Sequence, residues 1–180
     1  MIGATTIERR AAPLEVRASG RRLEGYAATF GAVAALGAVA EVIAPGAFRT
    51  ALGSGDILAL LDHDPGKVLG RTRNSTLRLS EDTRGLAFSL DLPDTQAGRD
   101  VLALAERGDL GGMSFGFTVP KGGDEWQGNT RTLRSVGLRE ISIVSAWPAY
   151  PDTSVALRSM TAANDTARRA RALRLMELAR

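Results

Sequence analysis

The sequence predicts a strand-rich α+β domain, built as a barrel or sandwich of short strands with helices packed on its outside. Two observations lead to this prediction. Short segments that are either apolar or alternately apolar and polar follow one another along most of the chain, and glycine, aspartate and asparagine separate them as turn residues do. Before the C-terminal tail, only two segments have the pattern of a helix, and both lie between predicted strands.

The predicted strands begin near residue 14. Residues 14–17 and 22–30 form a hairpin around Gly20, and residues 40–43 form a short third strand. Residues 57–61 are continuously apolar, which is typical of a strand buried on both faces. Further strands are predicted at residues 68–71, 76–79, 86–92, 113–119 and 138–144, with a polar hairpin tip inside residues 122–133.

Two helices interrupt the strands. Pro45, a residue suited to the first turn, opens a short helix that Gly53 ends. The second helix spans roughly residues 96–107, where apolar side chains recur on one face. Asp94 or Thr95 is its predicted N-cap, and Gly108 follows its last turn.

Composition excludes several classes of function. The chain has 180 residues, of which 44% are hydrophobic, enough for the core of one domain. It has no cysteine and a single histidine, which excludes disulfides, thiolate nucleophiles and two-histidine metal sites, so we expect no metal and no cofactor. No apolar run reaches the roughly 18 residues of a membrane span, and charged residues 8–10 stand where a signal peptide would be apolar. A soluble intracellular protein is expected.

Charge argues only weakly for a nucleic-acid partner. The net charge is +3, and the arginines are dispersed along most of the chain. Residues 158–180 differ, because they combine six arginines with an apolar helical stripe. This tail is interpreted either as a solvated helix that packs lightly on the body or as a docking or removable segment.

The only histidine, His63, lies at the end of the apolar strand 57–61, between Asp62 and Asp64. A strand end can present a side chain to a cleft, and an imidazole can take up and return a proton near neutral pH. His63 is therefore a candidate general base, and the alternative is an ordinary surface turn histidine.

Ser114 lies among glycines at the start of a predicted strand, in the segment Gly-Gly-Met-Ser-Phe-Gly-Phe. Glycines let another chain approach the backbone closely and leave room around a hydroxyl. A serine attacks carbonyls only when a base removes its proton, and His63 is the one imidazole available. The alternative is a structural serine in a glycine-relieved strand.

Glu140 lies among apolar residues near the start of the strand 138–144. A buried carboxylate needs a partner, and orienting an imidazole would supply one. A structural salt bridge with an arginine is the alternative. Asp62 and Asp64 are rivals for the orienting role, although the neighbours of a strand-end histidine usually point elsewhere.

The order of these three residues and their flanking segments together resemble the prohead maturation proteases of tailed bacteriophages. The matching blocks run from Gly25 to Ala156. They are Gly-Tyr-Ala-Ala-Thr-Phe-Gly at 25–31, Val-Ile-Ala-Pro-Gly-Ala-Phe at 42–48, Leu-Asp-His-Asp at 61–64, Gly-Arg at 70–71, Gly-Leu at 85–86, Asp-Leu-Gly-Gly-Met-Ser-Phe-Gly-Phe at 109–117, Leu-Arg-Glu-Ile-Ser-Ile-Val at 138–144 and Pro-Ala at 148–149.

The resemblance implies a fold similar to the herpesvirus assemblin proteases, a β-barrel with helices on its outside. It implies a serine endopeptidase with Ser114 as nucleophile, His63 as base and Glu140 in place of the assemblins' second histidine, with Arg71 a candidate for a charge that lines the site. Composition and the extent of the resemblance together divide the chain into a flexible lead-in (1–12), a protease domain (13–157) and the tail (158–180).

The resemblance also implies partners and a location. The substrates would be the major capsid protein and a scaffold segment, and the enzyme would act in the host cytoplasm inside the assembling procapsid of a phage, or of a gene transfer agent. Contact with the portal and self-association are left open, and no membrane and no specific nucleic acid are expected. The competing hypotheses are a non-catalytic assembly or scaffolding protein of the same fold and a nucleic-acid-binding module.

Overall fold

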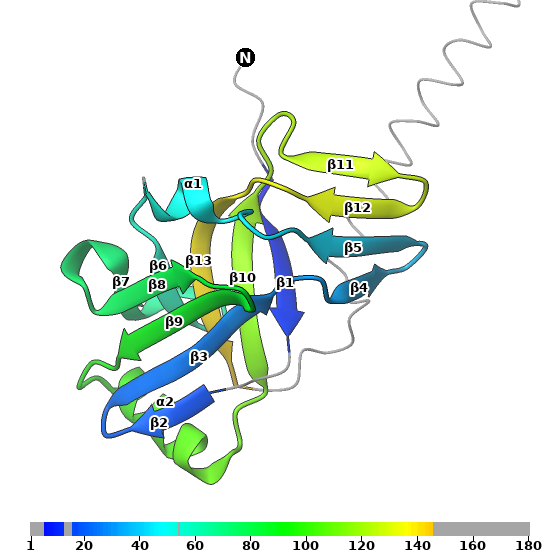
Figure 1. The fold of residues 1–180 in the computed structure, drawn as a ribbon. Coiled ribbons are helices and arrows are strands. Elements are labelled where there is room, and N and C mark those ends of the chain that lie inside the picture. The colour runs from blue at the N-terminus through cyan, green and yellow to red at the C-terminus, as the bar shows by residue number, and fades with distance from the viewer. Residues whose placement is uncertain (1–5, 13–15, 54, 146–180) are drawn as a thin grey trace, which may run out of the picture.

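The computed structural model describes residues 6–12, 16–53 and 55–145, and strands dominate this part of the chain (Figure 1). The strand-rich α+β class is confirmed. Its strands form three sheets, each with two free edges, and in the described residues no continuous ring of strand pairing closes a barrel. The predicted tail 158–180 lies outside the described residues.

A five-stranded sheet carries all three candidate residues at strands or strand ends, in the order β1-β10-β13-β6-β7. Its strands are β1 (Glu8–Ala12), β10 (Gly112–Thr118), β13 (Gly137–Val144), β6 (Leu58–Leu61) and β7 (Asp64–Arg71). Only β13 and β6 run parallel to each other, and the other neighbours are antiparallel.

Two four-stranded sheets complete the fold. The first is antiparallel and contains, in spatial order, β2 (Val16–Ser19), β3 (Arg22–Thr29), β9 (Gly85–Asp91) and β8 (Leu77–Glu81). The second contains β11 (Asp124–Gln127), β12 (Thr130–Leu133), β5 (Val39–Ile43) and β4 (Val33–Leu36). Figure 1 shows β3 crossing the long strand β10, against which it packs.

The helices are close to those predicted. Helix α2 (Gln96–Arg107) begins after Thr95, whose side chain accepts a hydrogen bond from the Gly98 amide, and it ends at Gly108 in the left-handed conformation. It packs near β2 and β7. Helix α1 (Arg49–Leu52) is a single turn. It ends at Gly53 as predicted, but it begins after Phe48 and not at Pro45, because residues 45–48 form a turn. A short 3₁₀ turn, η1 (Thr72–Asn74), follows β7.

One hydrophobic core joins the three sheets. Phe48, Phe115 and Phe117 are among its largest buried side chains. The rings of Phe48 and Phe115 meet edge to face with centroids 5.6 Å apart, and those of Phe115 and Phe117 stack at 5.2 Å. Because β10 contributes Phe115 and Phe117, packing in the core fixes the position of this strand.

Two strands differ from the sequence-based expectation. Residues 1–12 were expected to be a flexible lead-in, but Glu8–Ala12 form the edge strand β1. The segment Val33–Leu36, for which no element was expected, forms β4. Both are short strands at the edge of a sheet. Strand β1 pairs with the distant β10, and β4 pairs with the next strand, β5. Neither segment shows a clear local pattern of half-burial.

Candidate active site

His63 lies in the two-residue turn that connects β6 to β7. Leu61 pairs with Asp64 across this turn, and both Asp62 and His63 have positive φ values, 51° and 60°. Such turns match the twist of a hairpin but cost non-glycine residues of order 1–3 kcal/mol each, although aspartate and histidine tolerate them better than most. The Asp62 carboxylate fixes the turn, because it accepts hydrogen bonds from the amide (2.8 Å) and the hydroxyl of Ser145.

The carboxylate of Glu140 on β13 contacts the imidazole. His63 Nδ1 and Glu140 Oε1 are 2.7 Å apart, and Ser142 donates its hydroxyl hydrogen to Oε2 at 2.6 Å. Glu140 is only 7% exposed. An ionised carboxylate can only accept, so Nδ1 carries the hydrogen of this contact and a neutral His63 keeps the lone pair of Nε2 free to act as a base.

Gly116 on β10 makes room for this carboxylate. It lies directly opposite Glu140 in the pairing of β10 with β13. A Cβ atom at position 116 would come within 2.3 Å of Glu140 Oε1, and no relaxed structure allows such a contact. Glycines near Ser114 were expected to leave room around the hydroxyl, and this one instead accommodates Glu140.

Ser114 lies on β10, two residues before Gly116 and directly opposite Ser142. Side chains of opposed residues share a face of the sheet with Cβ atoms about 5 Å apart, so Ser114, Ser142 and Glu140 form one polar row. Ser114 is 2% exposed, and its hydroxyl donates to the backbone oxygen of Arg10 at 2.8 Å. In the described part of the chain, no hydrogen bond joins Ser114 to His63.

The other sequence candidates have partners elsewhere. Asp62 binds Ser145, as described above, and Asp64 accepts from the Gly66 amide at 2.8 Å, so neither carboxylate contacts His63. Arg71 pairs with Asp56, which raises the pKa of the guanidinium and lowers that of the carboxyl. Of the three carboxylates considered as orienting groups, only Glu140 reaches the imidazole.

Three further residues contribute to the site, and none of them was predicted from the sequence. They are Ser142, Arg10 through its backbone oxygen, and Arg9, whose Nε lies 3.8 Å from Glu140 Oε1. Ser142 could have been found from the strand period, since it follows Glu140 by two residues and so shares its face. The two arginines belong to a strand that has no local signal.

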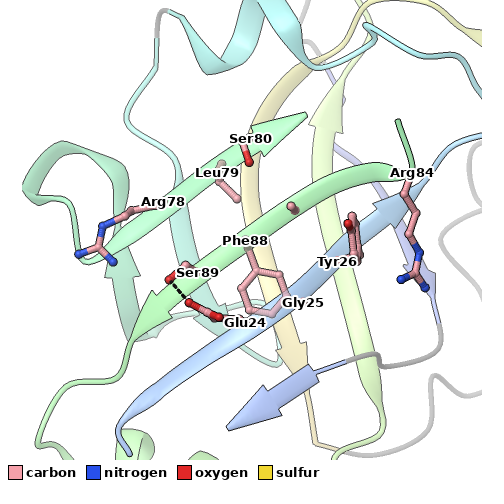
Figure 2. Close-up of a pocket in the computed structure, with 10 residues that line it drawn as sticks. Glu24, Gly25, Tyr26, Arg78, Leu79, Ser80, Arg84, Phe88 and Ser89 are labelled. Atoms are coloured by element: carbon pink, nitrogen blue, oxygen red, sulfur yellow. Dashed lines mark hydrogen bonds between the residues drawn. The ribbon is translucent and has the colours of Figure 1, made fainter. Parts of the chain in front are cut away.

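A broad surface depression lies away from this cluster. It is an open depression of about 760 Å³ over the β3–β9–β8 face, and Glu24, Tyr26, Arg78 and Phe88 are among its lining residues (Figure 2). Ser89 donates to Glu24 across its wall at 3.2 Å. No candidate residue lines it. Within the described residues, no group of three or more potential metal ligands occurs, and no helix is long and apolar enough to cross a bilayer.

The family model of the caudovirus prohead serine proteases matches residues 7–167, most of the chain. The chain belongs to this family. The resemblance found in the sequence is thereby confirmed, and with it the role of a serine protease in prohead maturation. A protease of this family acts within the procapsid, and its substrates are capsid and scaffold proteins.

A solved structure shows a similar fold. It is the capsid assembly protease gp21 of bacteriophage T4, which this chain matches with a TM-score of 0.53 at 11% sequence identity. The match covers 79% of this chain and 96% of the T4 protein. At 11% identity, the similarity shows only that the two proteins share a fold. No curated protein matches its sequence.

Proposed function

We propose that His63, Ser114 and Glu140 are the catalytic triad of this prohead protease. The contact between His63 Nδ1 and Glu140 Oε1 at 2.7 Å, with Ser114 in the same polar row of the sheet, carries this proposal. Glu140 holds the imidazole in the tautomer that leaves Nε2 free, and its charge stabilises the imidazolium that forms during the reaction.

In the proposed reaction, the Ser114 hydroxyl loses its proton to His63 Nε2 while its oxygen attacks the scissile carbonyl carbon. The tetrahedral intermediate collapses, the C–N bond breaks, and His63 delivers the proton to the leaving amine. Water then gives a proton to His63 while its oxygen attacks the acyl carbon. The bond between that carbon and the Ser114 oxygen breaks, the acid is released, and His63 returns the proton to the Ser114 oxygen. For these steps to occur, the Ser114 hydroxyl must break its hydrogen bond to the Arg10 carbonyl and turn toward His63.

The proposal extends to the biological setting. The protease domain includes β1 and therefore begins before residue 13. Its three sheets enclose their common core in the manner of an assemblin barrel. The tail 158–180 lies outside the catalytic unit. The major capsid protein and a scaffold segment are cleaved inside the shell, and portal contact and self-association are compatible with this setting. Neither a cofactor nor nucleic acid takes part in the chemistry.

Co-expression with its major capsid protein tests the triad. Mass spectrometry of new capsid N-termini is the readout. Ser114→Ala and His63→Ala are each expected to abolish processing, and the double variant is expected to be no worse than either, since residues that act as one unit are not additive. Ser80→Ala, which truncates an exposed serine on β8, is the matched control. Normal processing by Ser114→Ala would refute the nucleophile assignment.

A further inference from the structure

The N-terminal strand β1 lies directly on the proposed catalytic residues. It pairs antiparallel with β10 along the edge of the five-stranded sheet (Figure 1). Ala11 lies opposite Ser114, and Arg9 lies opposite Gly116. Ser114 donates to Arg10 O at 2.8 Å, and Arg9 Nε lies 3.8 Å from Glu140 Oε1. One five-residue strand therefore contacts two of the three triad members.

This contact is incompatible with proteolysis. A serine hydroxyl has one hydrogen, and here it is given to the Arg10 carbonyl rather than to His63. The Arg10 carbonyl turns its oxygen, not its carbon, toward Ser114, so the Arg10–Ala11 bond is not placed for attack. Ser114 is 2% exposed in this arrangement, and β1 occupies the edge of β10 beside it, where an extended substrate would otherwise pair.

Polar contacts attach β1 to the body. Strand β1 is held by its backbone hydrogen bonds to β10 and also by a group of charged side chains, here called the β1 ion cluster. This cluster joins β1 to the sheet that contains β5, β11 and β12. Its members are Glu8, Arg10, Glu41, Asp124 and Arg131. Arg10 Nε donates to Glu41 Oε1 at 2.6 Å, and Arg131 donates to Glu8 at 2.7 and 3.0 Å.

The ion cluster forms two distinct positions for side chains of a strand at this edge. The first position holds the side chain of Arg10. Its guanidinium donates to the buried carboxylate of Glu41, which is 2% exposed, and its central carbon lies 5.4 Å from the centroid of the Phe117 ring. Arg131 receives the carboxylate of Glu8. Without β1, Glu41 and Arg131 would each face the vacated edge with one partner fewer.

We propose that the edge of β10 is the docking edge for the peptide substrate, and that β1 occupies it as an internal pseudo-substrate that must leave before cleavage. This proposal rests on the proposed function. The substrate binds as an extended strand, by the main-chain pairing of β-strand addition. It carries a basic side chain for Glu41 and Phe117 at the position of Arg10, and an acidic side chain for Arg131 two residues earlier.

Labelling of Ser114 by a fluorophosphonate tests the proposal on the full chain. Arg10→Ala removes a charged contact of β1, and the labelling rate is expected to rise about tenfold or more, the factor that one charged hydrogen bond represents. Arg78→Ala, which removes an exposed ion pair with Asp91 between β8 and β9 in another sheet, is the matched control and should label at the wild-type rate. Glu8→Gln is a milder second variant with the same expected direction.

A free peptide with the sequence of residues 6–12 provides the second measurement. Added to the Arg10→Ala protease it should lower the labelling rate again, and the same peptide with glutamate at the Arg10 position should not. An Arg10→Ala or Glu8→Gln protease that keeps its amide protection in β13 and labels at the wild-type rate would overturn the proposal. Equal inhibition by both peptides would overturn the basic subsite.

Failure of this inference differs from failure of the proposed function. Labelling that persists in Ser114→Ala, or that is unaffected by His63→Ala, contradicts the triad. Labelling that depends on both residues but not on the β1 contacts leaves the triad intact and contradicts only the role of β1.

Discussion

Glu140 is the most constrained residue of the site. Its two oxygens have different partners, His63 on one and Ser142 on the other, and the strand opposite has a glycine where any side chain would collide with it. Burial of a carboxylate costs free energy unless such partners are present. The geometry of the site therefore depends on a few contacts of the Glu140 carboxylate, so a single substitution at one of them is expected to change activity.

Glu140→Gln is expected to reduce activity less than loss of Ser114 or His63. The amide keeps the size of the side chain but not the charge that stabilises imidazolium, and a charged hydrogen bond is worth about 1.5–3 kcal/mol. This corresponds to a roughly 10- to 150-fold lower kcat/KM. Activity per folded molecule and the melting temperature are measured on the same sample. Wild-type specific activity with a lowered melting temperature would indicate a purely structural carboxylate.

Gly116→Ala is expected to impair catalysis although it alters none of the proposed triad residues. The new Cβ would meet Glu140 Oε1 at 2.3 Å and force the carboxylate away from His63. Overpacking of this kind destabilises by about 1–3 kcal/mol. Gly53→Ala is the control, because its nearest atom would lie at an ordinary 3.7 Å. Equal peptidase activity of the two folded variants would contradict the spatial role of Gly116.

At the scale of elements, the turn between β6 and β7 and the edge strand β1 act in opposite ways on the site. The turn holds His63 against Glu140 through a conformation that Asp62 and Ser145 stabilise. Strand β1 covers the nucleophile and is held by ion pairs. Burial alone raises the pKa of Glu8, but hydrogen bonds and charge from Arg131 and Arg10 outweigh it, so the pKa of Glu8 lies below its ordinary value of 4.5.

Glu8→Gln is expected to be less stable than the wild type, by an amount that depends on pH. A depressed folded-state pKa contributes stability above the ordinary value near 4.5, and this contribution is lost as the pH falls through the folded-state pKa. The difference in melting temperature should therefore be largest at neutral pH and should disappear in acid. The remaining charges of the cluster, Arg10, Glu41, Asp124 and Arg131, are present in both proteins. A difference that grows on acidification would contradict this assignment.

At the scale of the whole molecule, the site is assembled from distant parts of the chain. The hydrogen bond from Ser114 to Arg10 joins residues 104 positions apart, and the contact of His63 with Glu140 joins residues 77 apart. One core packs all three sheets together, so the geometry of the site depends on the complete body. All the site contacts described above lie before residue 146.

Removal of the tail is accordingly expected to leave peptide-bond cleavage unchanged. A chain that ends at Arg158 should cleave a peptide substrate at the full-length rate but should be packaged less efficiently into procapsids, because the basic tail is the segment available for docking on an acidic or apolar surface. Replacement of Arg168, Arg169, Arg171 and Arg174 by glutamine keeps the tail's length and tests its charge. Loss of peptidase activity in a folded truncated chain would show that the tail belongs to the catalytic domain.

Local pattern was enough to predict most elements. Period-two alternation, the continuous apolar run before His63 and the caps of α2 depend on neighbouring residues, so they are visible without a structure. The residue types of the proposed triad were also predictable, since the chain has one histidine and the flanking segments resemble a known family. The segments 33–36 and 8–12 were not predicted as strands, because what defines an edge strand is the partner it pairs with.

The sequence by itself determined the strand-rich class, the family and the candidate residues, because these follow from local periodicity, composition and motifs. Only the tertiary structure decided that Glu140, rather than Asp62 or Asp64, reaches His63, that Gly116 makes room for that carboxylate, and that β1 pairs with β10 beside Ser114. Each of these depends on the register between strands far apart in the chain. Register is set by how the whole core packs, and a shift of one residue would turn every side chain of a strand to the opposite face.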